Sequence, residues 1–429
     1  MVREIANKTK LFILVAIALI FLTCEHDKTP LQTGAGTKLT LSLEDVTCTE
    51  AWLRLTVDEL PVQAGIRLLR NDSIVYNEPL TSGDTLLYDS GLLPNAGYRY
   101  RALLTKNGKE LSQSPVVSVQ TMDTTSHELQ WEVFTFGGYS GDSYLLDAAI
   151  VNDNNIWAAG KIDGDSLNPR MDYNAVHWNG QQWELKRLLY GGNFWTIRTV
   201  YAFSENDITF ASFIHWDGTH FVQMPIPEVL MGWGSNTIWG TSSRDYYMAG
   251  DFGTIAHYNG TTWQKLESGT ETPIVDMWGS RRNGKTVILA AVSTKEPYAD
   301  IKLLSISPGG VHDTLQNGLT QIVYSVWFNE NSPIYIAGDG LREFKKGRWQ
   351  EVPIPPYFTH KIRGTAINNI FVLGAFDFVA HFNGMNWHYY TDFPLSYGAL
   401  VGVAVTENLV VIVGDDGRRA AVVVGRRVR

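Results

Sequence analysis

The sequence predicts an all-β protein in which a β-sandwich precedes a seven-bladed β-propeller. A phrase of His, an aromatic residue, Asn or Asp, and Gly recurs from residue 177 onward, each time with an aromatic residue three positions after the Gly. A period of about 40 residues built from short strands is typical of propellers. Short strands of alternating polarity precede this region, and 39 Gly with 12% aromatic residues favour turn-rich β structure.

Residues 1–23 have the features of a targeting segment. Basic residues precede the uninterrupted apolar run Leu11–Leu22, which is too short for a stable membrane-spanning helix and is typical of a signal peptide. The run ends in Phe21-Leu22-Thr23-Cys24, which resembles the lipobox of bacterial lipoproteins, although two of its positions depart from the usual residues. The resemblance implies that Cys24 carries the lipid and that residues 24–37 form a tether. An ordinary cleaved signal and an uncleaved anchor are the alternatives.

Residues 38–122 are expected to form the sandwich. The segment Leu92–Arg101 contains Leu-x-Pro-x-x-x-Tyr and resembles the corresponding segment of fibronectin type III domains. The resemblance implies that the hydroxyl of Tyr98 bonds to upstream backbone as a tyrosine corner, and that Trp52 is the core tryptophan of the second strand. Cys48 is the only cysteine besides the lipidation candidate, so no disulfide framework is available. We expect a small buried thiol in a strand.

Residues 129–429 are expected to form the propeller, after a short polar linker. The third copy of the repeat shows its unit most clearly, as four strands in which Asn259-Gly260 joins the last two. Asn-Gly is favoured in type I′ hairpin turns because both central residues need positive φ, so the sequence predicts such a turn here. Six copies lie near residues 156–183, 207–221, 238–266, 274–315, 324–351 and 362–389.

A seventh copy begins at Ala399, but the chain stops before its outer strand. Segment Leu129–Val133 resembles Gln181–Leu185, the outer strand of the first copy, and Gly-Gly follows soon after each of them. We therefore predict that the first strand after the sandwich completes the last blade. This pairing would close a ring of seven blades and leave no sheet edge unpaired.

The repeated histidines are the first candidates for chemistry. Each blade is rotated about the ring, so they cannot converge on one metal ion, and we expect each to pack against the outer-strand aromatic residue across its hairpin. The Gly-Asp-x-Gly turns between middle strands hold too few carboxylates for a calcium site. The sequence contains no nucleophile elbow, zinc-protease, phosphate-loop or dinucleotide motif. It therefore predicts no catalytic residues, no metal and no cofactor. The four histidines are His177, His215, His257 and His381.

The candidate ligand site lies on loops at the mouth of the central channel. In propellers, the loops after the outer strand and between the two middle strands share one face, and here these loops are long and rich in aromatic residues. Loops held by a rigid scaffold often carry function. Alternatively, the prolines merely stiffen the connectors and the aromatic residues plug the channel. The candidate ligand-binding residues are Tyr190, Trp233, Tyr357 and Tyr397.

The whole chain resembles bacterial envelope lipoproteins that carry a fibronectin type III module before a propeller. The formal net charge of −9 argues against nucleic-acid binding, which requires basic residues. The resemblance implies a lipid-anchored, non-catalytic protein of the cell envelope that captures a glycan or protein on the loop face. Two alternatives stay open. One is a polysaccharide hydrolase or lyase with carboxylates at the channel mouth, and the other is a structural subunit of an envelope assembly.

Overall fold

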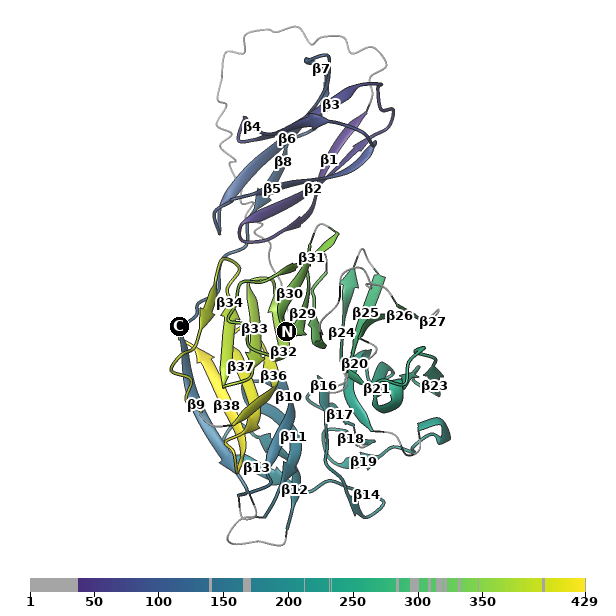
Figure 1. Cartoon of the computed structure of the whole chain (residues 1–429), viewed down its shortest axis with the longest axis vertical. Coiled ribbons are helices and arrows are strands. Elements are labelled where there is room, and N and C mark those ends of the chain that lie inside the picture. The colour runs from purple at the N-terminus through teal and green to yellow at the C-terminus, as the bar shows by residue number, and fades with distance from the viewer. Residues whose placement is uncertain are drawn as a thin grey trace, which may run out of the picture.

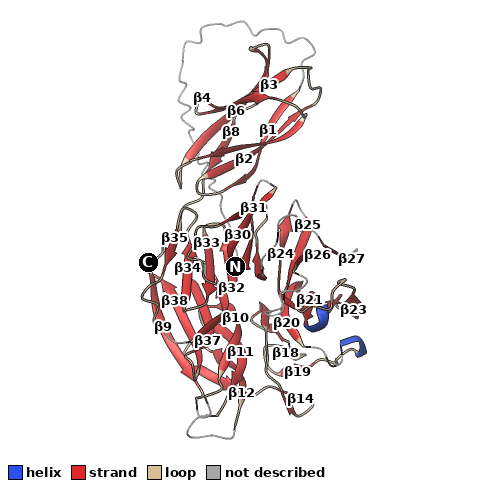
Figure 2. Cartoon of the chain, viewed as in Figure 1, coloured by secondary structure: helices blue, strands red, loops and turns tan. Residues whose placement is uncertain are grey.

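The computed structural model describes residues 38–428, apart from residues 139–140, 165–170, 212, 231, 233, 283–284, 294–300, 308–309, 314–318, 320–321, 331–332, 346 and 396–397. The regular structure consists of β-strands and two single-turn 3₁₀ helices, η1 (Glu228–Leu230) and η2 (Asp251–Gly253) (Figure 2). No helix of the described part is long and apolar enough to span a membrane. Cys24 and the predicted signal segment lie outside the described residues.

Two antiparallel sheets at the N-terminal end of the described chain enclose one core, and we call them the sandwich. One sheet has the order β1-β2-β5, and the other has the order β4-β3-β6-β7 with β8 also paired to β6. The strands are β1 (Leu39–Val46), β2 (Glu50–Val57), β3 (Ala64–Arg70), β4 (Ser73–Pro79), β5 (Asp84–Ser90), β6 (Gly97–Lys106), β7 (Lys109–Gln113) and β8 (Val117–Gln120).

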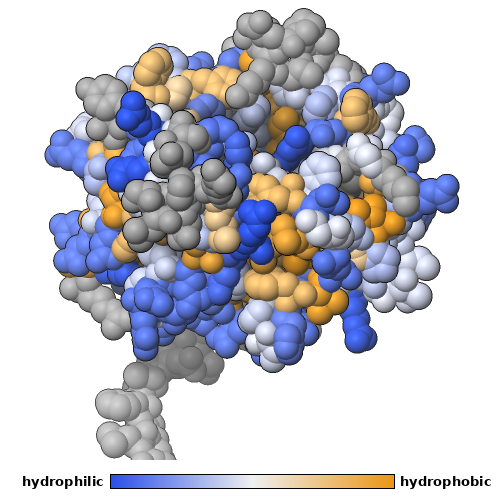
Figure 3. Space-filling model, turned by 90° about the horizontal axis from the view of Figure 1, so that it is seen from below, coloured by the Kyte–Doolittle hydropathy of each residue, from blue (hydrophilic) through white to orange (hydrophobic). Residues whose placement is uncertain are grey.

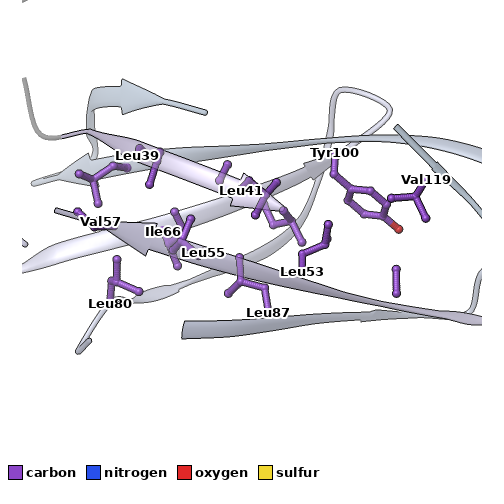
Figure 4. Packing of buried hydrophobic residues seen from close by; sticks show 14 of the residues in the cluster. Leu39, Leu41, Leu53, Leu55, Val57, Ile66, Leu80, Leu87, Tyr100 and Val119 are labelled. Carbon is purple, nitrogen blue, oxygen red and sulfur yellow. The ribbon is translucent and has the colours of Figure 1, made fainter. Parts of the chain in front are cut away.

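Alternation along the strands builds the sandwich core. Leu53 and Leu55 of β2 point inward and meet Ile66 of β3, and all three side chains are fully buried (Figure 4). Tyr100 of β6 closes one end of this core, where its hydroxyl donates a hydrogen bond to the Asp89 carboxylate at 2.7 Å. Buried apolar side chains from both sheets therefore hold the sandwich together.

Of the two predictions drawn from the resemblance to fibronectin type III domains, the one for Tyr98 is confirmed and the one for Trp52 is wrong. The backbone N–H of Leu93 donates a hydrogen bond to the hydroxyl of Tyr98 at 2.8 Å, which is the tie predicted for a tyrosine corner. Trp52, however, is not a core residue. Its neighbours Ala51 and Leu53 are fully buried, and the period of two along a strand turns Trp52 to the opposite, outer face.

The remainder of the described chain forms seven four-stranded antiparallel sheets and one two-stranded ribbon. We number the four-stranded sheets in chain order. Sheet 1 contains β10 (Tyr144–Asn152), β11 (Asn155–Ile162), β12 (Tyr173–Trp178) and β13 (Trp183–Lys186), and the ribbon of β14 (Leu189–Tyr190) and β15 (Asn193–Phe194) follows it. Sheet 2 contains β16 (Val200–Ser204), β17 (Asp207–Phe210), β18 (Ile214–Trp216) and β19 (Phe221–Gln223).

The later sheets repeat the same pattern of four strands. Sheet 3 contains β20 (Ser235–Ser242), β21 (Asp245–Gly250), β22 (Ile255–Tyr258) and β23 (Trp263–Leu266), and sheet 4 contains β24 (Ile274–Arg282), β25 (Lys285–Val292), β26 (Lys302–Ser307) and β27 (Gly310–Asp313). Sheet 5 contains β28 (Val323–Trp327), β29 (Ile334–Gly338), β30 (Gly340–Lys345) and β31 (Arg348–Glu351). Sheet 6 contains β32 (Thr359–Ala366), β33 (Asn369–Gly374), β34 (Phe378–Phe382) and β35 (Trp387–Tyr389).

Sheet 7 joins strands from the two ends of this region. It contains β36 (Ala399–Val405), β37 (Leu409–Asp415), β38 (Ala420–Arg427) and, at its outer edge, β9 (Leu129–Phe136). The pairing of β9 with β38 runs without a register shift from Leu129 opposite Arg427 to Phe136 opposite Ala420. This is the pairing predicted from the sequence.

The first strands of the seven sheets contact one another in a circle, from β10 through β16, β20, β24, β28 and β32 to β36, which returns to β10 (Figure 1). Apolar side chains fill the space between neighbouring sheets. One buried cluster, for example, joins Ile156 of sheet 1 to Val422 of sheet 7. The described sheets therefore form a closed ring.

The Asn-Gly hairpins do not have the predicted turn. Of the two residues in Asn259-Gly260, only Gly260 has positive φ, at 88°, so this is not a type I′ turn. The side-chain oxygen of Asn259 instead accepts hydrogen bonds from the backbone N–H groups of Thr261 and Thr262, and the turn spans four residues between β22 and β23. Asn serves here through its side chain rather than its backbone conformation.

The sandwich docks beside the ring, next to sheets 5 and 6 (Figure 1). Lys345 of sheet 5 places its Nζ 2.6 and 2.7 Å from the two carboxylate oxygens of Glu50 in the sandwich. The same ammonium lies 5.7 Å from the ring centre of Trp52 and 5.8 Å from that of Tyr88. The outward side of Trp52 thus forms part of a socket for a lysine of the ring.

Cys48 belongs to the same joint between the sandwich and the ring. It is fully buried, as predicted, but it lies in the bend between β1 and β2 rather than in a strand. Its thiol donates to the Asp123 carbonyl at 3.2 Å and lies 4.0 Å from the Asn383 carbonyl in sheet 6. The linker is bound as well, because the Thr125 N–H donates to the same Asn383 carbonyl at 3.3 Å.

Candidate functional site

The central channel is lined by the first strands of the sheets and holds a cavity of about 180 Å³. Asp276 on β24 is fully buried beside Lys361 and Arg363, which line this cavity. Its carboxylate lies 2.8 Å from Lys361 Nζ and 2.6 Å from Arg363 Nη2, both on β32, and it also accepts a hydrogen bond from the hydroxyl of Ser325 on β28. One carboxylate therefore connects the first strands of sheets 4, 5 and 6.

The carboxylates of Asp276 and Asp147 form ion pairs or hydrogen bonds with neighbouring strands. Burial alone would raise the pKa of Asp276, but the charges of Arg363 and Lys361 outweigh it and hold that pKa well below its ordinary value. Asp147 of sheet 1 accepts hydrogen bonds from the Thr199 hydroxyl and the Val200 N–H of sheet 2. Asp276 thus stays ionised, and both groups tie neighbouring sheets together.

The loop face is the end of the ring where the second and third strands of each sheet are joined and where each fourth strand leads to the next sheet. Tyr357 lies in the connection from sheet 5 to sheet 6, with 40% of its surface exposed. Its ring centre is 5.7 Å from that of Phe376 and 5.6 Å from that of the buried Phe378. Phe376 is at the tip of the turn between β33 and β34, with 83% of its surface exposed.

The other predicted ligand residues fare differently. Tyr190 in β14 is half-buried, it contacts the cores on both sides, and its hydroxyl donates to the Met224 carbonyl at 3.1 Å. Tyr190 is therefore a packing residue between two sheets. Trp233 and Tyr397 lie outside the described residues. Tyr190 and Tyr357 are the two candidates that lie within the described residues, and of these Tyr357 has the exposed aromatic ring.

Comparisons with known proteins bear on the fold. No protein-family model and no curated protein matches the chain. It is similar to the solved structure "YCF48 bound to D1 peptide", with a TM-score of 0.53 and 15% identity over 71% of this chain and 97% of that chain. At this identity the likeness shows the fold alone. The ring of sheets is a β-propeller.

Two further solved structures are similar to the chain at lower scores. YCF48 from Cyanidioschyzon merolae has a TM-score of 0.49 and 12% identity, over 69% of this chain and 98% of that chain. The Pan2 WD40 domain of Neurospora crassa has a TM-score of 0.46 and 12% identity, over 71% of this chain and 98% of that chain.

The repeated histidines of the propeller do not pack as predicted. The strand register places His257 opposite Gln264 across the outer hairpin, not opposite Trp263. On its other side His257 pairs with Tyr247 of the second strand, and the two rings stack with centres 4.2 Å apart. His177 stacks on Trp157 in the same way. The prediction missed the second strand as the stacking partner.

Burial lowers the pKa of two of these histidines. Burial, followed by the charge of Lys186, lowers the pKa of His177 to about 4. Burial, followed by the charge of Arg427, lowers that of His381 to about 2. Both rings are therefore neutral at physiological pH. Within the described ranges, no group of three or more His, Cys, Asp or Glu side chains could hold a metal ion.

The sequence prediction missed two phenylalanines on the loop face. Phe376 and Phe252 occupy the turns between second and third strands in sheets 6 and 3, and 72% of the Phe252 surface is exposed. Both have positive φ, at 60° and 55°. Ala375-Phe376-Asp377-Phe378 carries no Gly, so nothing in this stretch distinguishes the turn from a continuous strand.

Hydrophobic residues on the side opposite the sandwich gather only in small groups between hydrophilic ones (Figure 3), as is ordinary for protein surfaces.

Proposed function

We propose that this protein is a membrane-tethered, non-catalytic binding lipoprotein of the bacterial cell envelope, which captures a segment of another protein on the loop face of its propeller. The exposed pair of Tyr357 and Phe376 is the observation that carries this proposal. Aromatic side chains give large contact areas with few rotatable bonds, and they are enriched among residues that dominate binding energy. A glycan is the other ligand that such a pair could stack against.

The comparison adds support for a protein ligand. YCF48, whose fold is similar, was solved bound to a D1 peptide. A rigid ring with exposed aromatic side chains on its loops suits the same kind of task. The exposed aromatic side chains remain the main reason for proposing a protein ligand.

The finer architecture belongs to the same proposal. We take each four-stranded sheet as one blade of a seven-bladed propeller that β9 closes. We take the sandwich as a fibronectin type III domain, supported by its division into the sheets β1-β2-β5 and β4-β3-β6-β7 and by the bond between Tyr98 and Leu93. With the sandwich docked through Lys345, lipid at Cys24 would hold the propeller near the membrane.

The two channel carboxylates that the structure engages in ion pairs and hydrogen bonds, Asp276 and Asp147, are poor candidates for hydrolytic chemistry. A hydrolase or lyase needs one group that can give up a proton near neutral pH. Asp276 has its pKa held well below the ordinary value, and Asp147 is hydrogen-bonded to the next sheet. A turnover assay on a polysaccharide panel tests this point, and release of new reducing ends or unsaturated products would contradict a non-catalytic role.

The binding proposal is tested with the full chain in detergent on peptide and glycan arrays. Tyr357→Ala should weaken the binding of any ligand found by at least about tenfold without lowering the melting temperature, because the side chain is exposed. Tyr190→Phe is the matched control, since it removes only a hydroxyl that bonds to Met224. Unchanged binding by Tyr357→Ala would refute the site. No binder on either array would refute the function.

The anchor has a separate test. Cells that express the chain are fed an alkyne-labelled fatty acid, and label should appear on the intact sequence but not on Cys24→Ala. Membrane fractionation should show the same contrast, because stable anchoring needs two or more acyl chains. Label retained by Cys24→Ala would contradict the lipoprotein assignment.

A further inference from the structure

A pair of histidines joins the linker between sandwich and ring to sheet 6. His127 lies in residues 123–128, part of the connection from β8 to β9, and its Nδ1 is 2.8 Å from the Nδ1 of His381 in β34. The other ring nitrogen of His127, Nε2, is 2.8 Å from the side-chain oxygen of Asn386, in the turn between β34 and β35. The linker is therefore attached to sheet 6 through the imidazole of His127.

His381 holds the inner end of this contact. Its side chain is fully buried, and its ring stacks on Phe371 of β33 with centres 4.4 Å apart. Its Nε2 is 3.3 Å from the hydroxyl of Thr125 in the linker and 3.5 Å from Nη2 of Arg427 in β38. The same arginine donates a hydrogen bond to the carbonyl of Ser126. The two imidazoles therefore lie where the linker, sheet 6 and sheet 7 meet.

The contact between the two Nδ1 atoms requires a particular protonation state. One imidazole must carry a hydrogen on Nδ1 and the other must offer a lone pair there, because a hydrogen bond needs one donor and one acceptor. Two neutral rings meet this condition. If both rings are protonated, two N–H groups point at each other and no acceptor is left. The hydrogen bond can therefore form only while at least one ring is neutral.

Positive or titratable groups face the pair from two neighbouring strands. Arg427 reaches His381 from β38. His388 of β35 lies against His127, with ring centres 5.1 Å apart, and its own side chain is exposed. A first proton on either imidazole is therefore added next to a group of the same sign or to one that can acquire it.

Groups that can carry negative charge lie around the arginine and on the outside of the linker. Tyr390 of β35 is a phenol whose hydroxyl donates to the His127 carbonyl at 2.9 Å, and burial raises its pKa, so it is neutral. Glu407, in the turn between β36 and β37, accepts a hydrogen bond at its carbonyl from Arg427 Nε at 2.8 Å. Glu128 follows His127, with its side chain exposed.

These surroundings favour the neutral form of both rings. Burial lowers the pKa of His127, and the hydrogen bond with Asn386 raises it in part. The charges of His388 and Arg427 then lower it further. Burial, followed by the charge of Arg427, lowers the pKa of His381 to about 2.

We propose that His127 and His381 form a pH-sensitive latch, which fixes residues 123–128 against sheet 6 near neutral pH and releases them in acid. This device does not depend on any ligand of the loop face. When the linker leaves, both rings meet water and can accept protons that they exclude while the latch is closed. Lys345 of the ring keeps its ion pair with Glu50 of the sandwich, so we expect a loosened linker rather than separated domains.

The pH window follows from the direction of both shifts. Each histidine has a folded pKa below the ordinary value of about 6.5, so the latch is at full strength above that pH and weakens as pH falls below it. Between about pH 7.5 and about pH 5.0, a histidine that binds a proton only after opening raises the opening equilibrium about thirtyfold. His381 should contribute close to this amount, and His127 a smaller one.

Hydrogen exchange, measured by mass spectrometry on the full chain in detergent, tests the latch. After correction for intrinsic rates, peptides that cover residues 122–128 should exchange at least about tenfold faster at about pH 5.0 than at about pH 7.5. Strands β2 and β3 of the sandwich contain no histidine and are the internal reference. A smaller rise in the linker, or a rise of the same size in β2 and β3, would overturn the proposal.

Two variants separate protonation from the loss of a contact. In the double variant His127→Asn, His381→Asn the two amides can still hydrogen-bond to each other but cannot titrate, so the acid-induced rise should fall below about twofold. His127→Asn alone changes only the half-buried partner, and its rise should be at least about twofold smaller than that of the intact chain. A rise as large as in the intact chain, in either variant, would overturn the latch.

The matched control makes the same substitution at a histidine outside the latch. His220 is exposed in the turn between β18 and β19 of sheet 2, so His220→Asn should keep the full acid-induced rise in residues 122–128. An equal reduction in His220→Asn and His127→Asn would show that acid acts on the whole ring, and it would overturn the assignment to this pair.

Discussion

Replacing Asp276 by Ala is expected to destabilise the propeller by about 3–5 kcal/mol at neutral pH. Its carboxylate is fully buried and forms ion pairs with Lys361 and Arg363, whose side chains are 13% and 12% exposed. Truncation leaves two cations in the channel wall without their counter-charge, and it also deprives the Ser325 hydroxyl and the Val326 N–H of their acceptor.

The magnitude follows from what remains after the truncation. An uncompensated buried charge costs several kcal/mol, of which neutralisation of Lys361 can recover part. Replacing the whole cluster by apolar residues of similar size is often close to neutral. The triple variant Asp276→Ala, Lys361→Met, Arg363→Met should therefore be more stable than Asp276→Ala alone, by at least about 2 kcal/mol.

Hydrogen exchange measured by mass spectrometry can report this effect locally, because the chain has two parts and one unfolding free energy would not describe both. Amides of β24, β28 and β32 should lose protection in Asp276→Ala, whereas those of the sandwich should not. A loss below about 1 kcal/mol, or a triple variant no more stable than the single one, would refute the account of Asp276 as the counter-charge of two buried cations.

The same group predicts the acid response. The pKa of Asp276 is depressed in the folded protein, so its stabilisation is fully present above the unfolded value of about 3.9 and is lost as pH falls from there towards the folded pKa. The intact chain should lose propeller stability below about pH 4, and the triple variant should lose less over that window. Parallel acid curves for the two proteins would contradict this.

Three other predictions concern the joint and the ring. Lys345→Ala should weaken docking of the sandwich by about 1–3 kcal/mol, because it removes the ammonium that contacts Glu50 and Trp52. Limited proteolysis should then cleave the linker faster, and an unchanged cleavage rate would argue against this contact. Gly384→Ala should destabilise the same joint by about 1–3 kcal/mol, because a Cβ there would lie 2.3 Å from the Cys48 thiol, and Cys48→Ala should restore part of the loss in thermal melts. Deleting residues 129–135 should abolish cooperative unfolding of the propeller, because β38 loses its partner; a melting curve like that of the intact chain would show that the strand is dispensable.

The architecture was predictable where one pattern recurs. Copies of the repeat each contain the same four strands, so a single well-marked copy, residues 238–266, indicated the others. The incomplete last copy pointed to β9 as its missing strand. Trp131 shows why that pairing is specific. Its ring lies over Gly425, where any Cβ would be 2.5 Å from it, and against Tyr390 and Phe393.

The errors arose where one residue type can fill several roles. The resemblance to fibronectin type III domains implied a core position for Trp52, but the smaller neighbours Ala51 and Leu53 already set which face is inward. Asn259 was assigned to a turn by its backbone, whereas it acts through its side chain. Phe376 gave no signal, because positive φ at a non-Gly residue is a property of the folded turn and not of the sequence.

Departures from the repeat carry information that the repeat itself does not. In the fifth copy Glu343 replaces the usual His, and Lys345 replaces the usual Asn. Glu343 still pairs with the second strand, at Tyr335, and the two share a hydrogen bond, while Lys345 reaches Glu50 of the sandwich. Both substitutions therefore occur where the blade meets another domain.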